Sequence, residues 1–218
     1  MRGVYEAVLF DVAGTLAIPE DRDAWVRACG VDAALAEELE RVGRPGGPYP
    51  ASVPAALAEV YDNRDVSPEL HRSAYAGLLA TVVAPEPARA LYERILSPEG
   101  WCAYPDAAPT LRALKARSVA TAAGSNVGFD LRPVLEGLGL LSFLDAVVLS
   151  YEIGAVKPDP DVFHMACDAL GVEPERTLMV GDHPEADGGA ADAGLGVLIL
   201  PMSAAGADHG LGAVLDMV

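Results

Sequence analysis

The second half of the chain alternates short apolar segments with amphipathic ones, and this alternation restricts the fold more than any other feature of the sequence. Strands that alternate with helices of this length form a parallel sheet covered on both faces. The apolar run at residues 5–10 is typical of a further buried strand, and a last helix is expected to begin within residues 184–194. We therefore predict an α/β fold. Its expected strands are "YEAVLF", "SVATAAG", "AVVLS", "RTLMVGD" and "GVLIL".

Residues 17–104 have a different character from the rest of the chain. Alanine, leucine and glutamate dominate in segments such as "DAALAEELERV" and "SPELHRSAYAGLLATVV", with apolar residues at helical spacing. Prolines and glycines separate the segments, most clearly in the loop "GRPGGPYP" (43–50). The pattern predicts four or five helices inserted after the first strand. We therefore divide the chain into a core of residues 1–16 and 105–218 and an all-helical inserted domain of residues 17–104.

The charge of the chain excludes several classes of partner. The 218 residues carry a formal net charge of −17 and include only two lysines, so the surface repels nucleic acid and anionic membranes. No apolar run approaches the roughly 18 residues of a membrane helix, and no export signal is visible. Three widely spaced cysteines without a CxxC pair indicate reduced thiols. We expect a cytoplasmic protein; its oligomeric state is not predicted.

Polar side chains follow several of the predicted strands. Asp11 follows the first strand, Ser125 and Asn126 follow another, Lys157 lies in a loop after a third, and Asp182 follows a fourth. In a parallel α/β sheet, ligands bind at the carboxyl ends of the strands. These residues come from distant parts of the sequence, yet the fold predicts that they meet at one edge. We interpret this edge as the functional site.

The residue types at this edge favour phosphate and metal chemistry. Asp11, Asp182 and Asp187 form an oxygen-rich set that suits Mg²⁺, whose preferred ligands are hard oxygens. A carboxylate at a strand end can also act as a nucleophile. Lys157 can neutralise both that carboxylate and a bound phosphate, and Ser125 can hold a phosphoryl oxygen. Each residue alone could instead cap a helix or a turn.

The motifs "DVAGT", "SN", "KPDP" and "GDHPEAD", in this order, resemble those of the haloacid dehalogenase superfamily. The resemblance covers nearly the whole chain and implies a Rossmann-like core with a helical cap domain, acting on a small phosphorylated substrate. It implies catalytic roles for Asp11 as nucleophile, Ser125 and Lys157; substrate contacts from Thr15, Ser125, Asn126 and Lys157; and Mg²⁺ ligands from Asp11, Asp182 and the main-chain carbonyl of Ala13, with Asp187 supporting the metal.

Ala13 departs from the pattern of the family's phosphatases. The residue at this position is usually an aspartate, the general acid that protonates the leaving group and then activates water. A general acid or base is typically worth about 10²–10⁴-fold in rate. Binding and metal chemistry should therefore be intact while proton transfer is impaired. His183, beside Asp182, is a candidate replacement acid, although a solvated loop histidine is the simpler interpretation.

Several functions fit this altered site. We favour a Mg²⁺-dependent phosphohydrolase for substrates with good leaving groups, such as acyl phosphates. A weakly catalytic or non-catalytic domain that binds a phosphorylated ligand or a protein partner is the alternative, and a 2-haloacid dehalogenase is a further one. Phosphonate-cleaving enzymes of this family also carry alanine at the position of Ala13, but they need a cap-domain lysine. No lysine occurs within residues 1–114, so that mechanism is not available in its known form.

Overall fold

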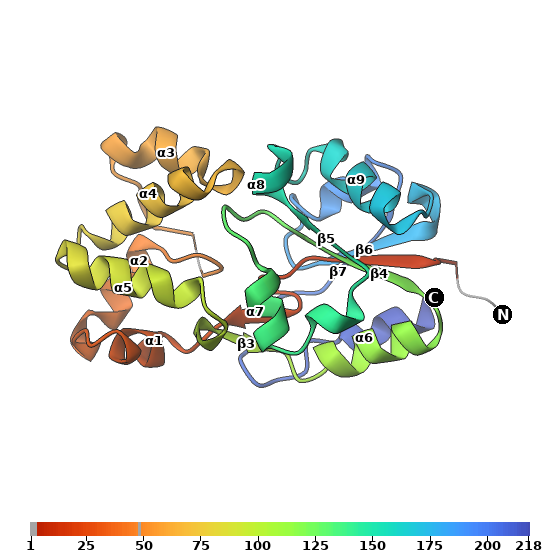
Figure 1. Ribbon diagram of the computed structural model, residues 1–218, viewed down its shortest axis with the longest axis horizontal. Coiled ribbons are helices and arrows are strands. Elements are labelled where there is room, and N and C mark those ends of the chain that lie inside the picture. The colour runs from red at the N-terminus through yellow and green to blue at the C-terminus, as the bar shows by residue number, and fades with distance from the viewer. Residues whose placement is uncertain (1–3, 48) are drawn as a thin grey trace.

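The computed structural model describes residues 4–47 and 49–218, and its centre is a five-stranded parallel sheet. Residues 1–3, and Pro48 of the predicted loop 43–50, lie outside the described residues. The strand order is β5-β4-β1-β6-β7, which places the first strand of the chain in the middle (Figure 1). The predicted α/β fold is confirmed. The strands are β1 (Ala7–Phe10), β4 (Ala120–Ser125), β5 (Ala146–Leu149), β6 (Thr177–Gly181) and β7 (Gly196–Ile199).

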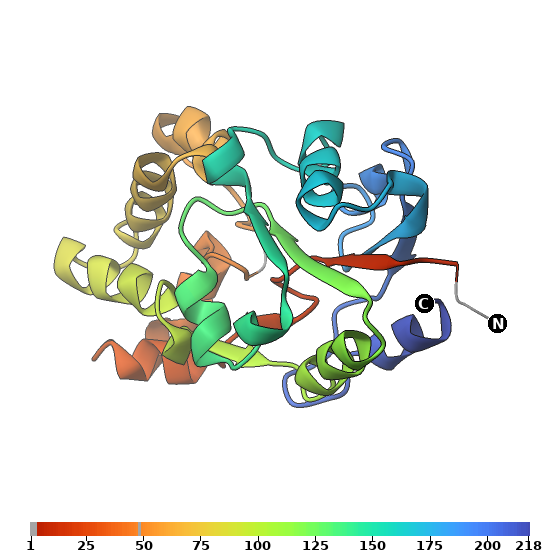
Figure 2. The same ribbon diagram turned by 45° about the vertical axis from the view of Figure 1, so that its right-hand side comes forward.

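Strand β1 is buried on both faces because helices cover the sheet from both sides. Phe10 faces the larger hydrophobic cluster, shared with α6 (Ala107–Ala116) and α7 (Arg132–Gly137). Leu9, one residue earlier, faces a second cluster formed largely by α9 (Pro160–Leu170). Side chains alternate between the two faces of a strand, so successive residues enter different clusters. Figure 2 shows α9 on one side of the sheet and α6 on the other.

The segment between β1 and β4 forms a helical lobe at the left of Figure 1. Two three-residue strands, β2 (Ala17–Pro19) and β3 (Trp101–Ala103), pair antiparallel where the chain enters and leaves it. The prediction of an all-helical insertion was therefore incomplete, because three residues are too few to show a strand periodicity. The helices are α1 (Arg22–Ala28), α2 (Ala36–Val42), α3 (Ala58–Asp62), α4 (Pro68–Leu79) and α5 (Pro85–Ile95).

The prediction of a helix that begins within residues 184–194 was wrong. Only a short 3₁₀ segment, η7 (Gly188–Ala191), forms there. Two consecutive glycines disfavour an α-helix. The turn also packs closely, since a Cβ on Gly189 would lie 2.3 Å from the Pro158 Cβ. None of the helices in the described parts of the chain has the length and apolar character needed to cross a membrane.

The helical lobe contacts the sheet unit tightly at the loop after β4. A Cβ on Gly128 would lie 2.4 Å from the His71 Cβ and 2.5 Å from the main-chain oxygen of Arg64. Nearby, the Ser150 hydroxyl at the start of α8 (Ser150–Ile153) donates to the main-chain oxygen of Asp65 at 2.5 Å. Both contacts fix the 3₁₀ segment η3 (Arg64–Val66) against the core.

Gly128→Ala should destabilise the protein because the added methyl group meets both the His71 side chain and the Arg64 main chain. Inserting atoms into a packed contact typically costs about 1–3 kcal/mol in the free energy of unfolding. Urea denaturation of the wild type and the variant measures this difference. Gly212→Ala is the matched control, because nothing lies within 4 Å of the added Cβ. Equal stabilities for the two variants would contradict the tight contact.

Candidate active site

The carboxyl ends of the central strands open into a pocket of about 330 Å³ between the sheet and the helical lobe. The residues that were expected to meet at this edge do so, with one exception. Thr15 is fully buried and is not part of the pocket wall, and its Oγ1 has no hydrogen-bond partner among the described residues. On the sheet side, the pocket is lined by Asp11, Ala13, Ser125, Asn126, Lys157, Asp182, His183 and Asp187.

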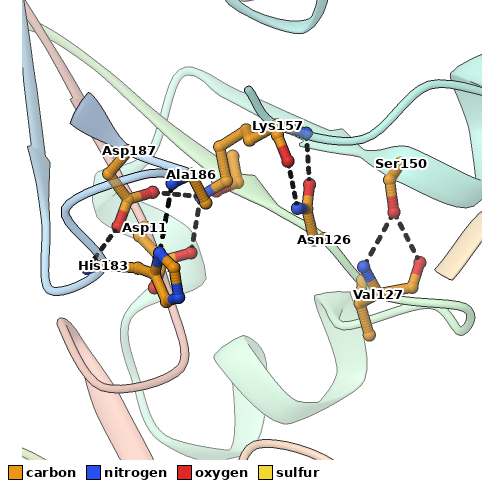
Figure 3. A network of polar contacts seen from close by, with 9 residues as sticks. Asp11, Asn126, Val127, Ser150, Lys157, His183, Ala186 and Asp187 are labelled. Carbon is orange, nitrogen blue, oxygen red and sulfur yellow. Dashed lines mark hydrogen bonds and ion pairs between the residues drawn. The ribbon is translucent and has the colours of Figure 1, made fainter. Parts of the chain in front are cut away.

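Lys157 is the centre of the polar network in this pocket (Figure 3). Its ammonium group lies 2.7 Å from Asp11 Oδ1 and 2.7 Å from Asp187 Oδ1, and it donates to the main-chain oxygen of Gly124 at 2.9 Å. The residue is only 4% exposed. One buried cation thus joins the end of β1, the end of β4 and the loop after β6.

Asn126 fixes the main chain of Lys157. Its side-chain amide donates to the Lys157 carbonyl at 2.9 Å, and its Oδ1 accepts from the Lys157 N–H at 2.7 Å (Figure 3). This pair of hydrogen bonds orients the loop that carries the lysine. Both ends of the Asn126 amide are thereby used within the protein, so the geometry gives Asn126 a positioning task. Its predicted contact with substrate stays a prediction.

The carboxylates of Asp11, Asp182 and Asp187 can bring ligand oxygens within 4.8 Å of one another. Gly14 makes this approach possible, since its φ is +98° and a Cβ there would lie 2.4 Å from Asp182 Oδ2. Asp187 uses one oxygen for Lys157 and accepts from the His183 N–H with the other at 2.9 Å. The oxygens left for a hard cation therefore belong mainly to Asp11 and Asp182. This donor set fits Mg²⁺.

The pocket holds more negative than positive charge. Burial raises the pKa of Asp11 to about 7, an effect that Lys157 opposes and that Asp187 and Asp182 reinforce. Burial, followed by the nearby Asp187, also raises the pKa of Asp182. Burial lowers the pKa of Lys157, but Asp11 and Asp187 together outweigh it, so the ammonium stays protonated. A divalent cation would relieve the remaining repulsion between carboxylates.

His183 is held by its own loop. Its Nδ1 accepts a hydrogen bond from the Ala186 N–H at 3.1 Å, which leaves Nε2 as the nitrogen that carries the proton in the neutral ring (Figure 3). The ring also meets the edge of Tyr49 from the helical lobe, with centroids 6.2 Å apart. His183 lines the pocket, and its role as a replacement acid stays a prediction.

The helical lobe, predicted as a cap domain, supplies the opposite wall, and none of its residues was predicted to belong to the site. No local motif marks these residues, because only the docking of the lobe onto the sheet brings them to the pocket. They differ from the sheet side in carrying aromatic rings and a second cation. The polar and aromatic residues of this wall include Tyr49, Tyr61, Arg64, Asp65, His71 and Tyr75.

Comparison with known proteins shows which family the chain belongs to. Residues 5–194 match the family model described as haloacid dehalogenase-like hydrolase. The chain belongs to this family. The predicted superfamily is confirmed, and the family's proteins that resemble this chain have names of both phosphatases and dehalogenases.

Three similar proteins illustrate this range. A protein of Thermus thermophilus named phosphoserine phosphatase is 42% identical over 106 residues, which are 48% of this chain and 43% of that protein. The chain thus matches less than half the length of that relative. A Methanopyrus kandleri protein named glyceraldehyde 3-phosphate phosphatase is 32% identical in an alignment that covers 84% of this chain and 77% of that protein. The superposition with a crystal structure of a dehalogenase covers 92% of this chain and 86% of the dehalogenase chain, with 26% identity and a TM-score of 0.67.

Asp11→Asn should stabilise the protein above pH 7 when no divalent cation is present. Well below pH 4 the carboxyl is protonated in folded and unfolded chains alike, so the variant and the wild type should be equally stable. Between about pH 4 and 7 the unfolded chain loses this proton first, so wild-type stability falls as pH rises. The difference should reach on the order of 1–4 kcal/mol above pH 7.

Urea denaturation at several pH values, in the presence of a chelator, measures this effect. Asp192→Asn is the matched control, because it removes the same charge from an exposed position. A pH-independent difference between Asp11→Asn and the wild type would show that the pKa of Asp11 is not raised.

Proposed function

We propose that the protein is a Mg²⁺-dependent phosphohydrolase that acts on small phosphorylated substrates through an aspartyl-phosphate on Asp11. The observation that carries this proposal is the contact of Asp11 with the buried Lys157 at 2.7 Å, beside two further carboxylates within 4.8 Å. A nucleophilic carboxylate, a fixed cation and a cluster of hard oxygens are what phosphoryl transfer to aspartate requires. The helical lobe serves as the cap that covers the substrate.

Each residue has a defined task in this reaction. One oxygen of Asp11 attacks phosphorus in line with the leaving oxygen, and the resulting acyl phosphate is then hydrolysed by water, which regenerates the carboxylate. Ser125 holds a phosphoryl oxygen, Lys157 offsets the negative charge of Asp11 and the phosphoryl group, and Asp187 keeps the ammonium in place. Asp11, Asp182 and the Ala13 carbonyl would hold Mg²⁺, which would supply positive charge that screens the phosphoryl group from the carboxylates.

Ala13 limits the leaving groups that this site can release. It lines the pocket with a methyl group where the family's phosphatases carry an acid. An alcohol leaves poorly without a proton, whereas the carboxylate released from an acyl phosphate needs none. We therefore assign acyl phosphates and similarly activated phosphates as the substrate class.

Hydrolysis of a carbon–halogen bond is the second candidate function. Halide release also needs no proton donor, so a site with Ala13 is compatible with it. The structural likeness to a dehalogenase, at 26% identity, supports keeping this candidate. Dehalogenases of this family act without a metal, so the metal requirement separates the two functions.

Purified protein should release phosphate from acetyl phosphate in the presence of Mg²⁺, and much more slowly from sugar phosphates. Phosphate release is measured across a panel of both kinds, with and without a chelator. Asp11→Asn should abolish the activity because it removes the nucleophile, while the exposed Asp192→Asn should leave the activity unchanged.

Three outcomes would contradict this assignment. Turnover that survives in Asp11→Asn would exclude Asp11 as the nucleophile. Halide release from 2-haloacids in the presence of a chelator, without phosphate release from any member of the panel, would favour the dehalogenase. No turnover of either kind would favour a binding domain.

Ala13→Asp should raise kcat for sugar phosphates, because it restores a proton donor two residues after the nucleophile. The expected gain is about 10²-fold or more. Turnover of acetyl phosphate should change much less, since its leaving group needs no proton. An absent gain in a variant that still folds and still binds Mg²⁺ would show that the missing acid is not what limits this site.

A further inference from the structure

Arg64 is the second cation of the pocket. Among the described residues, it and Lys157 are the arginine and lysine side chains that line the cavity. Lys157 is already in contact with two carboxylates. An anionic group on the far end of a substrate therefore has Arg64 as its available positive partner.

The guanidinium of Arg64 is held in place by the helical lobe. Its Nε donates to the Tyr75 hydroxyl at 3.2 Å, and its Nη1 donates to the Tyr61 main-chain oxygen at 2.8 Å. It also stacks on the Tyr61 ring, 4.1 Å from the ring centroid. A guanidinium has five N–H groups. The two hydrogen bonds use two of them, and Asp65 lies 3.3 Å from Nη2. The group is therefore oriented in advance and keeps donors on Nη1 and Nη2 for a ligand.

The position of Arg64 relative to Asp11 is set by contacts between the lobe and the core. Segment η3, which carries Arg64, is joined to the core by the hydrogen bond from Ser150 to the Asp65 main chain. The loop at Gly128 leaves no room between itself and the Arg64 carbonyl. A substrate can thus span two fixed points, the phosphoryl site at Asp11 and the guanidinium on η3.

Apart from Lys157 and Arg64, the described residues of the wall include no lysine or arginine, and part of the wall is apolar. It contains the rings of Trp101 and Phe129 and the side chains of Val127, Leu131 and Met202. An anionic group buried among apolar side chains needs a charged partner. The volume of about 330 Å³ suits a molecule of a few carbon atoms besides its phosphoryl group.

We propose that Arg64 is a specificity-determining residue that binds a carboxylate on the substrate, so that the preferred substrates are small activated phosphates that also carry a carboxylate. This inference rests on the proposed function, because it takes the phosphoryl group to lie at Asp11. A planar guanidinium matches a carboxylate through two parallel hydrogen bonds.

Asp65 is the neighbour that modulates this contact. Its Oδ2 lies 3.3 Å from Arg64 Nη2. Burial raises the pKa of the Asp65 carboxyl to about 6 although Arg64 opposes the shift, and a bound carboxylate would raise it further. Asp65 therefore competes only weakly for Arg64 under mildly acidic conditions. Removing its charge should strengthen carboxylate binding.

The test uses two phosphonates that cannot be hydrolysed. In 3-phosphonopropionate the tail ends in a carboxylate, and in propylphosphonate it ends in a methyl group. Their affinities for the full chain with Mg²⁺ are measured by ³¹P NMR titration. The wild type should bind 3-phosphonopropionate about 10- to 100-fold more tightly, the value expected of a hydrogen-bonded charge pair.

Arg64→Met should remove this preference and leave the affinity for propylphosphonate unchanged. Arg64→Lys should restore part of it, and Asp65→Asn should increase it. Arg72→Met is the matched control, because Arg72 is an exposed arginine near the start of α4 that does not line the pocket. Unchanged propylphosphonate binding also shows that each variant is folded.

The outcomes separate this inference from the proposed function. If both phosphonates bind equally to the wild type, or if Arg64→Met weakens both equally, Arg64 has only a structural role and the inference is wrong while the function stands. If Asp65→Asn reduces the preference, the pair recognises a different group and the inference is also wrong. If neither phosphonate binds, the phosphoryl site itself is disproved, and the inference fails with it.

Discussion

The site depends on one buried ammonium. Lys157 contacts Asp11 and Asp187 at 2.7 Å each, and these three residues come from loops after three different strands. Without the lysine, two buried carboxylates would face each other in a pocket that also contains Asp182. Two further residues support this arrangement. Asn126 orients the main chain of Lys157, and Gly189 leaves room for Pro158, the residue after the lysine.

This ammonium does not balance the charge of the pocket, and the imbalance bears on how an acidic protein would bind the proposed anionic substrate. With a net charge of −17, the chain as a whole repels phosphate. Attraction must therefore be local. Burial, reinforced by neighbouring carboxylates, raises the pKa of Asp11 and of Asp182, and Lys157 offsets these effects only in part. A hard divalent cation would offset the remaining negative charge and would at the same time create a place for the phosphoryl group of the proposed substrate.

The helical lobe lines the pocket with polar and charged side chains as well as apolar ones. Its segment η3 is fixed on the core through Ser150 and Gly128, so Arg64 faces the same pocket as Asp11. The two walls differ, because the sheet side carries three carboxylates around Lys157 and the lobe side carries aromatic rings around Arg64 and Asp65. This division suits a small substrate with a phosphoryl group at one end and a different group at the other.

The sequence by itself determined the parallel sheet, its helical insertion and the meeting of Asp11, Ser125, Lys157 and Asp182, because strand alternation and strand-end positions are local patterns with a fixed geometric consequence. It did not determine which partner each polar group has. The use of the Asn126 amide on the Lys157 main chain, the burial of Thr15, the ribbon of β2 and β3, and the place of Arg64 were decided by tertiary structure. These features arise where segments distant in sequence pack together, and no local pattern records such packing.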